Sequence, residues 1–130
     1  MPVEIGMRGE AETVVTAQDT AQAMGSGLAP VLATPRMVAL MEGAAVNAVQ
    51  SALAPGEGTV GTRLDVTHDA ATPVGMKVWA QAEVTAVEGR RITFAVSAFD
   101  GRERIGGGVH QRFIIQSERF LAKAQGKLEG

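Results

Sequence analysis

The sequence predicts an α+β domain in which an antiparallel sheet wraps around one long helix. Two observations support this prediction: residues 34–53 read as a helix with an apolar face, and four strand-like stretches separated by short turn sequences follow it. Such an order is most simply folded by laying the sheet over the apolar face of the helix. A chain of 130 residues fits one such core and is short for two, so we expect a single domain over residues 1–130.

The elements expected before the long helix are a strand, a short helix and a flexible connection. The strand is predicted over residues 8–15. Thr16 is then expected to cap a short helix in TAQDTAQAM, which ends at Gly25. GSGLAP forms the connection.

The long helix has the clearest start signal in the chain. Thr34 stands before Pro35, as an N-cap residue stands before the first helical position, and APGEG stops the helix after about Leu53. Glu42 is unexpected in this helix. On a helical wheel its carboxylate falls inside the apolar stripe, among Val38, Val46, Val49 and Leu53.

Four strands are expected at residues 59–69, 76–87, 91–99 and 103–115, with EGR and DG as hairpin turns. Inside the last strand lie Gly106, Gly107 and Gly108, and glycine there commonly marks a bulge or a close approach by another backbone. We favour that reading over phosphate binding because no P-loop signature surrounds these glycines. Ser117 is expected to cap a closing helix through residue 123, which Gly126 ends.

Composition narrows the classes of function. The 12 basic and 14 acidic side chains give a net charge of -2 without runs of like charge, so we expect no nucleic-acid and no membrane-surface partner. The absence of cysteine excludes thiol nucleophiles, thiolate metal sites and disulfides. No apolar run reaches membrane-spanning length, and the N-terminus lacks the features of a signal peptide. We therefore expect a cytoplasmic protein whose partner is a small molecule or another protein.

A second ionisable group is predicted to point into the same interior as Glu42. In VGTRLDVTH, alternation along a strand places on the apolar, inward face Val60, Thr62, Leu64, Val66 and His68. The residues between them, which include Gly61, then lie on the opposite face of the strand and point away from the interior. If the long helix packs on this sheet, Glu42 and His68 enter one space from opposite sides.

A carboxylate and an imidazole that converge in an apolar interior are a candidate catalytic pair. Pairing favours the ionised acid and raises the proton affinity of the imidazole, whereas burial opposes both effects. Thr34 is a third candidate, because its hydroxyl lies at a helix N-terminus, where developing negative charge is stabilised. Structural alternatives stay open: His68 as a hydrogen-bonded core residue, Glu42 as a bridge at a dimer interface, and Thr34 as a cap only.

His110 and Arg112 are weaker candidates that share one face of the last strand. An arginine can bind phosphate with paired hydrogen bonds, but a solvated strand face is the favoured interpretation. The two histidines lie in separate strands and no HExxH motif is present, so we expect no metal site and no cofactor.

Three stretches establish a family resemblance: VLATPRMVALMEGAAV, LAPGEGTVGTRLDVTHDAATPVGMKV and VEGRRITFAVSAFDG. Over residues 31–123 the chain resembles the fluoroacetyl-CoA thioesterase family of hotdog-fold enzymes. A catalytic Thr, Glu and His of that family match Thr34, Glu42 and His68 in place and spacing. The family's active-site Gly and Arg match Gly61 and Arg112.

The resemblance implies a hotdog homodimer that binds acyl-CoA near the subunit interface and hydrolyses the thioester to CoA and a small carboxylic acid. By this resemblance His68 would act as general base, Glu42 would orient the attack or form a covalent intermediate, and Thr34 would position or polarise the thioester. Gly61 would offer backbone room or an N–H near the carbonyl. Arg112 would support CoA or its pantetheine arm.

One departure from the family concerns the acyl pocket. The fluoroacetyl enzyme has two phenylalanines that gate this pocket just before the helix, whereas the matching positions here are Gly25 and Leu28. We therefore expect Leu28 to line a wider or wetter pocket, with weaker discrimination in favour of fluoroacetyl groups.

Two other functions remain open at this level. A non-catalytic acyl-CoA-binding hotdog protein would keep the fold and the dimer while using Glu42 and His68 as an internal polar pair. A hotdog hydratase or dehydratase would have a different acid and base layout, usually with its histidine on the helix, and the helix here has none.

Overall fold

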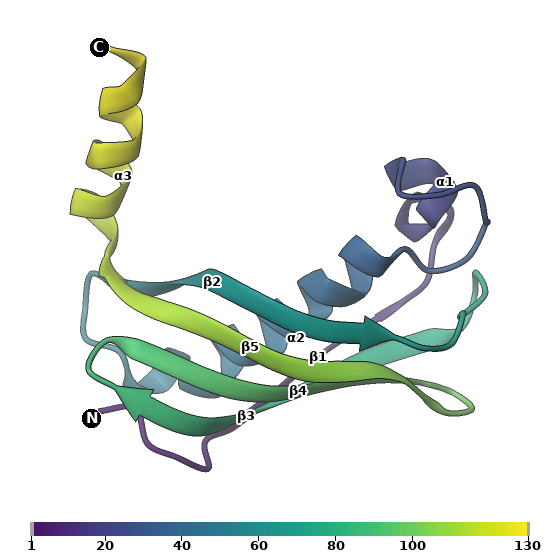
Figure 1. The fold of residues 1–130 in the computed structure, drawn as a ribbon, viewed down its shortest axis with the longest axis horizontal. Coiled ribbons are helices and arrows are strands. Elements are labelled where there is room, and N and C mark those ends of the chain that lie inside the picture. The colour runs from purple at the N-terminus through teal and green to yellow at the C-terminus, as the bar shows by residue number, and fades with distance from the viewer. Residues whose placement is uncertain (1, 130) are drawn as a thin grey trace.

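A five-stranded antiparallel sheet curls around one long helix in the computed structural model, which describes residues 2–129 (Figure 1). The strands lie in the order β1-β3-β4-β5-β2. Their bounds are Arg8–Val14 for β1, Glu57–His68 for β2, Lys77–Glu88 for β3, Arg91–Asp100 for β4 and Arg104–Gln116 for β5. The predicted α+β arrangement is confirmed.

The core lies between the sheet and the central helix α2 (Thr34–Val49). The helix buries one face, made of Met37, Leu40, Met41, Ala44, Ala45, Ala48 and Val49. Alternating side chains of β3 and β4 are buried on the sheet face that packs against the helix. They are Val78, Ala80, Ala82 and Val84 from β3 and Ile92, Phe94, Val96 and Ala98 from β4. Each large apolar side chain buried in this way contributes about 1.5–3 kcal/mol. The packing fixes α2 over β1, β3 and β4, and leaves β2 at the side of the helix.

The start of α2 differs from the prediction. Ala33, rather than Thr34, is the N-cap residue, and no side chain caps the helix. Thr34 is already the first helical residue, so the prediction that it acts as a cap is wrong. Its hydroxyl turns toward β2 instead, because Ala33 has taken the extended backbone conformation that a cap requires. At the other end a 3₁₀ turn, η2 (Gln50–Ala52), follows directly, so the helical run stops near the predicted position.

Two short helical turns take the place of the single short helix predicted before α2. They are η1 (Ala17–Asp19) and α1 (Ala21–Met24). Thr16 begins the first turn, and Thr20 begins the second because its hydroxyl accepts a hydrogen bond from a backbone N–H three residues later, at 3.2 Å. Gly25 ends α1 with φ +73°, a left-handed conformation that suits glycine, as predicted.

β2 lies at the edge of the sheet, and within residues 2–129 it pairs with β5 alone. A β-bulge shifts the register between Gly61 and Arg63. Because a bulge adds one residue to the strand, side chains before and after it no longer follow strict alternation. The predicted outward direction of Gly61 is therefore wrong: it pairs with Arg112 and faces α2, while His68 points inward as predicted.

The glycines of β5 allow a close approach by the neighbouring strand. A Cβ on Gly106 would meet the carbonyl oxygen of Thr67, and one on Gly108, where φ is +155°, would meet that of Asp65. The prediction that these glycines serve packing is confirmed.

The C-terminal helix α3 (Ser117–Gln125) stands away from the sheet, at the end opposite α1 (Figure 1). Gln116 caps it by accepting a hydrogen bond from the N–H of Arg119 at 2.8 Å, so the predicted cap at Ser117 is wrong. A 3₁₀ turn, η3 (Gly126–Leu128), follows. Within residues 2–129 the structure contains no helix whose length and hydropathy would let it cross a membrane.

Candidate active site

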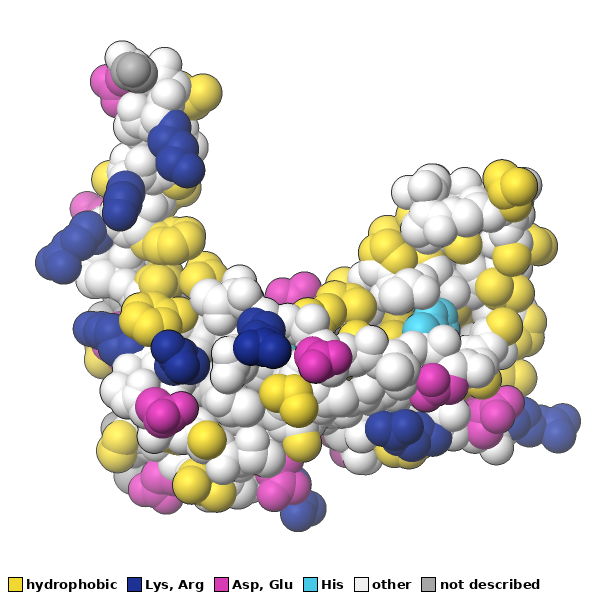
Figure 2. Space-filling model, in the orientation of Figure 1, with side chains coloured by type: hydrophobic (Ala, Val, Ile, Leu, Met, Phe, Trp, Pro, Cys, Tyr) yellow, Lys and Arg dark blue, Asp and Glu magenta, His cyan; other side chains and the backbone are white. Residues whose placement is uncertain are grey.

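The candidate site lies along the line where α2 faces the edge strand β2. Two pockets of about 250 Å³ each open there. The first, here called the Thr34 pocket, is lined by Val31, Thr34, His68, Asp69, Ala70 and Ala71. The second, the Glu42 pocket, is lined by Glu42, Gly61, Thr62, Arg63, Leu64 and His110. Figure 2 shows a broad hollow in the molecular surface above β2, between the α3 arm and the α1 segment.

Thr34 and His68 are hydrogen-bonded in the Thr34 pocket. The hydroxyl oxygen of Thr34 lies 2.8 Å from Nδ1 of His68. The pair forms because the first residue of α2 and the last residue of β2 lie next to each other. The second ring nitrogen of His68, Nε2, is buried and has no hydrogen-bond partner among residues 2–129.

The protonation state of His68 suits a base. Burial lowers the pKa of His68 below its ordinary value of 6.5, and the backbone of Ala70 and the charge of Asp69 offset only part of this shift. The imidazole is therefore neutral at pH 7. A neutral imidazole can accept a proton from a reacting group, which an imidazolium cannot do.

Glu42 makes a different contact. Its Oε2 lies 3.3 Å from a terminal nitrogen of Arg112, and 42% of the Glu42 side chain is exposed. The backbone of Gly61 lies against this carboxylate: a Cβ at that position would be 2.7 Å from Oε2 of Glu42. Glycine is therefore the residue that lets the carboxylate lie over β2. The role of Gly61 as backbone room or an N–H near the thioester carbonyl stays a prediction.

Two hydrogen bonds to Thr59 fix the guanidinium of Arg112. Its Nε donates to the Thr59 hydroxyl at 2.8 Å, and its second terminal nitrogen donates to the Thr59 carbonyl at 2.9 Å. Only 6% of Arg112 is exposed. Burial lowers the pKa of Arg112 while the carboxylate of Glu42 opposes that effect, and the guanidinium stays charged at neutral pH. The expectation of a solvated strand face here is wrong, because β5 is an interior strand whose inward face looks onto α2.

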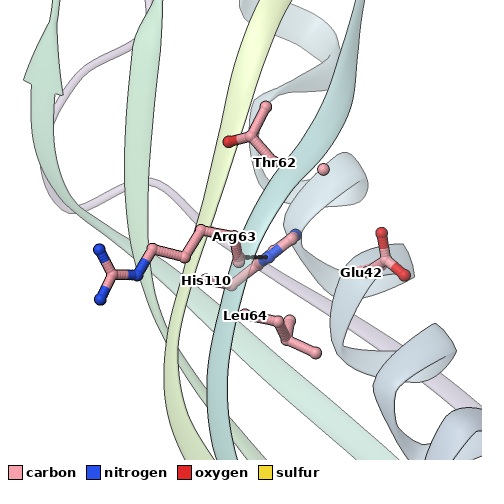
Figure 3. Close-up of a pocket in the computed structure, with 6 residues that line it drawn as sticks. Glu42, Thr62, Arg63, Leu64 and His110 are labelled. Atoms are coloured by element: carbon pink, nitrogen blue, oxygen red, sulfur yellow. Dashed lines mark hydrogen bonds between the residues drawn. The ribbon is translucent and has the colours of Figure 1, made fainter.

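His110, only a weak candidate from its sequence pattern, lines the Glu42 pocket. It is 1% exposed and joins the Glu42 pocket, with Nδ1 hydrogen-bonded to the carbonyl of Arg63 at 2.8 Å (Figure 3). Its Nε2 lies 3.2 Å from Arg112. The available signal was the two-residue spacing of His110 and Arg112, which puts both on one face.

One chain does not bring all the predicted residues together. Glu42 follows Thr34 by two helical turns, about 12 Å along the axis. Glu42 contacts Arg112 and not His68, so the predicted Glu42–His68 pair is not formed within the chain. Leu28 is 90% exposed and lines neither pocket.

The two pockets offer complementary chemistry. A hydroxyl bonded to a neutral imidazole is an arrangement that moves a proton during attack on a carbonyl carbon. A carboxylate fixed by a buried guanidinium can orient water or a polar substrate group. Such groups are suited to acyl transfer to water.

Comparisons with known proteins agree with this chemistry. A family model described as fluoroacetyl-CoA-specific thioesterase matches residues 15–118. A curated fluoroacetyl-CoA thioesterase of Streptantibioticus cattleyicolor is 52% identical over 97 residues, which cover 75% of this chain and 70% of that protein.

Solved structures show the same architecture. A structure of the fluoroacetyl-CoA thioesterase superposes with a TM-score of 0.91 at 41% identity, covering 98% of each chain. A thioesterase superfamily member of Thermus thermophilus superposes with a TM-score of 0.89 at 29% identity, covering 98% of this chain and 95% of that one. The predicted family, fold and enzyme class are thereby confirmed: the chain belongs to the fluoroacetyl-CoA-specific thioesterase family and is a thioester hydrolase with the hotdog fold.

Proposed function

We propose that this thioester hydrolase acts on small acyl-CoA thioesters and that Thr34, His68 and Glu42 carry out the reaction. The observation that supports the proposal most directly is the 2.8 Å hydrogen bond between the Thr34 hydroxyl and Nδ1 of His68. The products are CoA and a carboxylic acid, with water as the second substrate. The reaction needs no cofactor and no metal.

In the proposed mechanism water attacks the thioester carbonyl carbon beside Thr34. The water gives a proton to the Thr34 oxygen as the Thr34 proton moves to Nδ1 of His68, so the imidazole acts as the general base. The carbon–sulfur bond then breaks, and the imidazolium returns its proton so that CoA leaves as the free thiol. The start of α2 lies next to the developing oxyanion, where the positive end of the helix dipole favours negative charge.

The proposal includes a homodimer, because each chain has a free strand edge and a divided site. β2 exposes five consecutive residues, Gly61, Thr62, Arg63, Leu64 and Asp65. An open edge of this kind is a template for pairing with another strand. In a two-fold antiparallel pair of β2 strands, the His68 end of one lies beside the earlier half of the other, which carries Gly61. The Thr34 pocket of one copy then meets the Glu42 pocket of the other.

Arg112 and Gly61 are proposed to support Glu42 at the junction of the two copies. The guanidinium orients the carboxylate, and Gly61 leaves space for it and for the acyl-CoA. The cytoplasmic location inferred from the sequence belongs to the same proposal.

Leu28 is proposed to border the acyl group once a second copy covers it, since a fully exposed leucine has apolar surface to bury. With Gly25 and Leu28 at the gate positions, no aromatic ring closes over the acyl group. We therefore propose that acetyl-CoA and fluoroacetyl-CoA are hydrolysed with similar kcat/KM.

The test is a panel of short, branched and aromatic acyl-CoA thioesters with release of free thiol as the readout. Hydrolysis of short acyl groups above the uncatalysed rate is expected. Rates equal to the blank across the panel overturn the proposal. Calorimetric binding of the same thioesters without thiol release would instead support a non-catalytic acyl-CoA-binding protein.

A further inference from the structure

We propose that His110 is a positioning residue, which fixes the guanidinium of Arg112 and, through it, the carboxylate of Glu42. The inference rests on the function proposed above, in which Glu42 orients the reacting groups. His110 itself touches neither the Thr34 pocket nor the Thr34–His68 pair.

The hydrogen bonds of His110 determine its tautomer. Nδ1 lies 2.8 Å from the carbonyl oxygen of Arg63, and a carbonyl oxygen can only accept, so Nδ1 carries the proton. Nε2 lies 3.2 Å from a terminal nitrogen of Arg112, and a guanidinium can only donate, so Nε2 is the acceptor. Both ring nitrogens are thus used, in one orientation and one protonation state.

The bulge in β2 provides the partner for Nδ1. The register of β2 on β5 shifts between Gly61 and Arg63, which disrupts the ladder at this point. The carbonyl of Arg63 turns toward His110, while the Arg63 side chain points away from the pocket (Figure 3). Phe94 stacks on the imidazole at a centroid distance of 6.0 Å and limits the tilt of the ring.

His110 completes the set of contacts that hold Arg112. Thr59 binds Nε and one terminal nitrogen, which leaves the other terminal nitrogen with two hydrogens. One of these is directed to Nε2 of His110 and the other to Oε2 of Glu42. Without the acceptor on His110, rotation of the guanidinium would be restrained only from the Thr59 side, and the carboxylate would lose its fixed place over Gly61.

The neutral imidazole is required for this role. A protonated His110 would offer no acceptor and would place a positive charge beside Arg112. The charged groups that face the ring are Arg112 on β5 and Glu42 on α2. Burial is the largest influence on the pKa of His110 and lowers it, so the neutral form persists at pH 7.

Two substitutions of His110 distinguish a role in positioning Arg112 from a role in packing alone. In His110→Gln the side-chain oxygen reaches the place of Nε2 and keeps the acceptor for Arg112. In His110→Asn the amide keeps a donor at the place of Nδ1 and lacks that acceptor. We expect His110→Asn to lower kcat by roughly 10- to 100-fold with little change in KM, and His110→Gln to recover most of the loss, because small misplacements of reacting groups are costly. Equal kcat for both folded variants would overturn the inference.

Nitrogen NMR of the native protein gives a readout that does not depend on activity. We expect a His110 ring protonated at Nδ1 and unprotonated at Nε2 at pH 7, with slowly exchanging Arg112 side-chain N–H signals that His110→Asn loses. A ring protonated at Nε2 would overturn the inference even if thioesters are hydrolysed. A native protein that hydrolyses no thioester but shows the expected tautomer would instead overturn the proposed function, so the two failures are distinguishable.

Discussion

The hydroxyl of Thr34 lies 2.8 Å from Nδ1 of His68, so the first residue of the central helix and the last residue of the edge strand form one hydrogen-bonded unit. Because Ala33 occupies the N-cap position, the Thr34 hydroxyl is not used in capping and is available for this contact. The proposed proton transfer from Thr34 to His68 requires this contact.

Replacement of Thr34 tests the role of the hydroxyl. In the proposed mechanism the Thr34 hydroxyl passes a proton to His68, so Thr34→Ala should lower kcat by about 100-fold. Thr34→Ser keeps the hydroxyl at the same distance from the backbone and should keep most of the rate. The measurement is thiol release under saturating acyl-CoA. Equal losses in the two variants would show that the methyl group, and not the hydroxyl, matters at this position.

The free energy of unfolding should fall as the solution is made more acidic below about pH 6.5. Burial lowers the pKa of both His68 and His110. The unfolded chain therefore binds protons at these residues before the folded protein does, and stability is lost as pH falls from the ordinary histidine value toward the folded one. Denaturant titrations at pH 7.5, 6.5 and 5.5 measure the effect.

A matched variant assigns that loss to the histidines. Asp19 and Asp100 also have lowered pKa values, but their contribution is lost only near and below their ordinary value of 3.8. His110→Gln should therefore reduce the slope between pH 6.5 and 5.5. A native stability that stays level or rises over this interval would contradict the assigned direction of both shifts.

Gly61→Ala should impair catalysis without unfolding the protein. The new Cβ would lie 2.7 Å from Oε2 of Glu42, which is the far end of a flexible side chain, so the carboxylate should move and the strand should stay. A misplacement of about 1 Å can cost about 100-fold in kcat. Steady-state kinetics and the midpoint of urea unfolding measure the two effects.

Gly43→Ala is the control next to Glu42 in the same helix. Its new Cβ would lie 3.5 Å from the Cβ of Ala11, which is an ordinary contact. Alanine in place of a helical glycine should raise the free energy of unfolding by about 0.5–1 kcal/mol and leave kcat unchanged. If Gly61→Ala keeps native kcat, the place assigned to the Glu42 carboxylate is wrong.

Mixing two inactive variants tests whether the site is shared between copies. A heterodimer of His68→Ala and Glu42→Gln chains has one site with both residues intact. After unfolding and refolding of an equal mixture, about a quarter of native activity should return, as random two-fold pairing requires. Activity no higher than the average of the separate variants would show that each site is complete within one chain or that no dimer forms.

The fold was largely predictable from the sequence. The start signal near Thr34, the apolar stripe of α2 and the two short hairpin turns place most elements close to their observed bounds. The inward direction of His68 also follows from its strand pattern. These features depend on local periodicity and turn chemistry, which a single sequence records.

The details of the site were less predictable for two physical reasons. The bulge adds one residue between Gly61 and Arg63, both outside any apolar pattern, so nothing in the alternation shows that Gly61 faces inward. Strand order also decides burial: β5 lies between β4 and β2, which buries His110 and Arg112. The order of the strands in a sheet depends on contacts between segments that are distant in the sequence, so a local sequence pattern does not show it.

Replacement of His68 tests the central claim most directly. The measurement compares kcat/KM of the native protein with that of His68→Ala on the acyl-CoA that the native protein hydrolyses fastest, after circular dichroism has shown that the variant is folded. Loss of a general base predicts a fall of about 100- to 10,000-fold. A folded His68→Ala variant that hydrolyses the same thioester at the native rate would contradict the account.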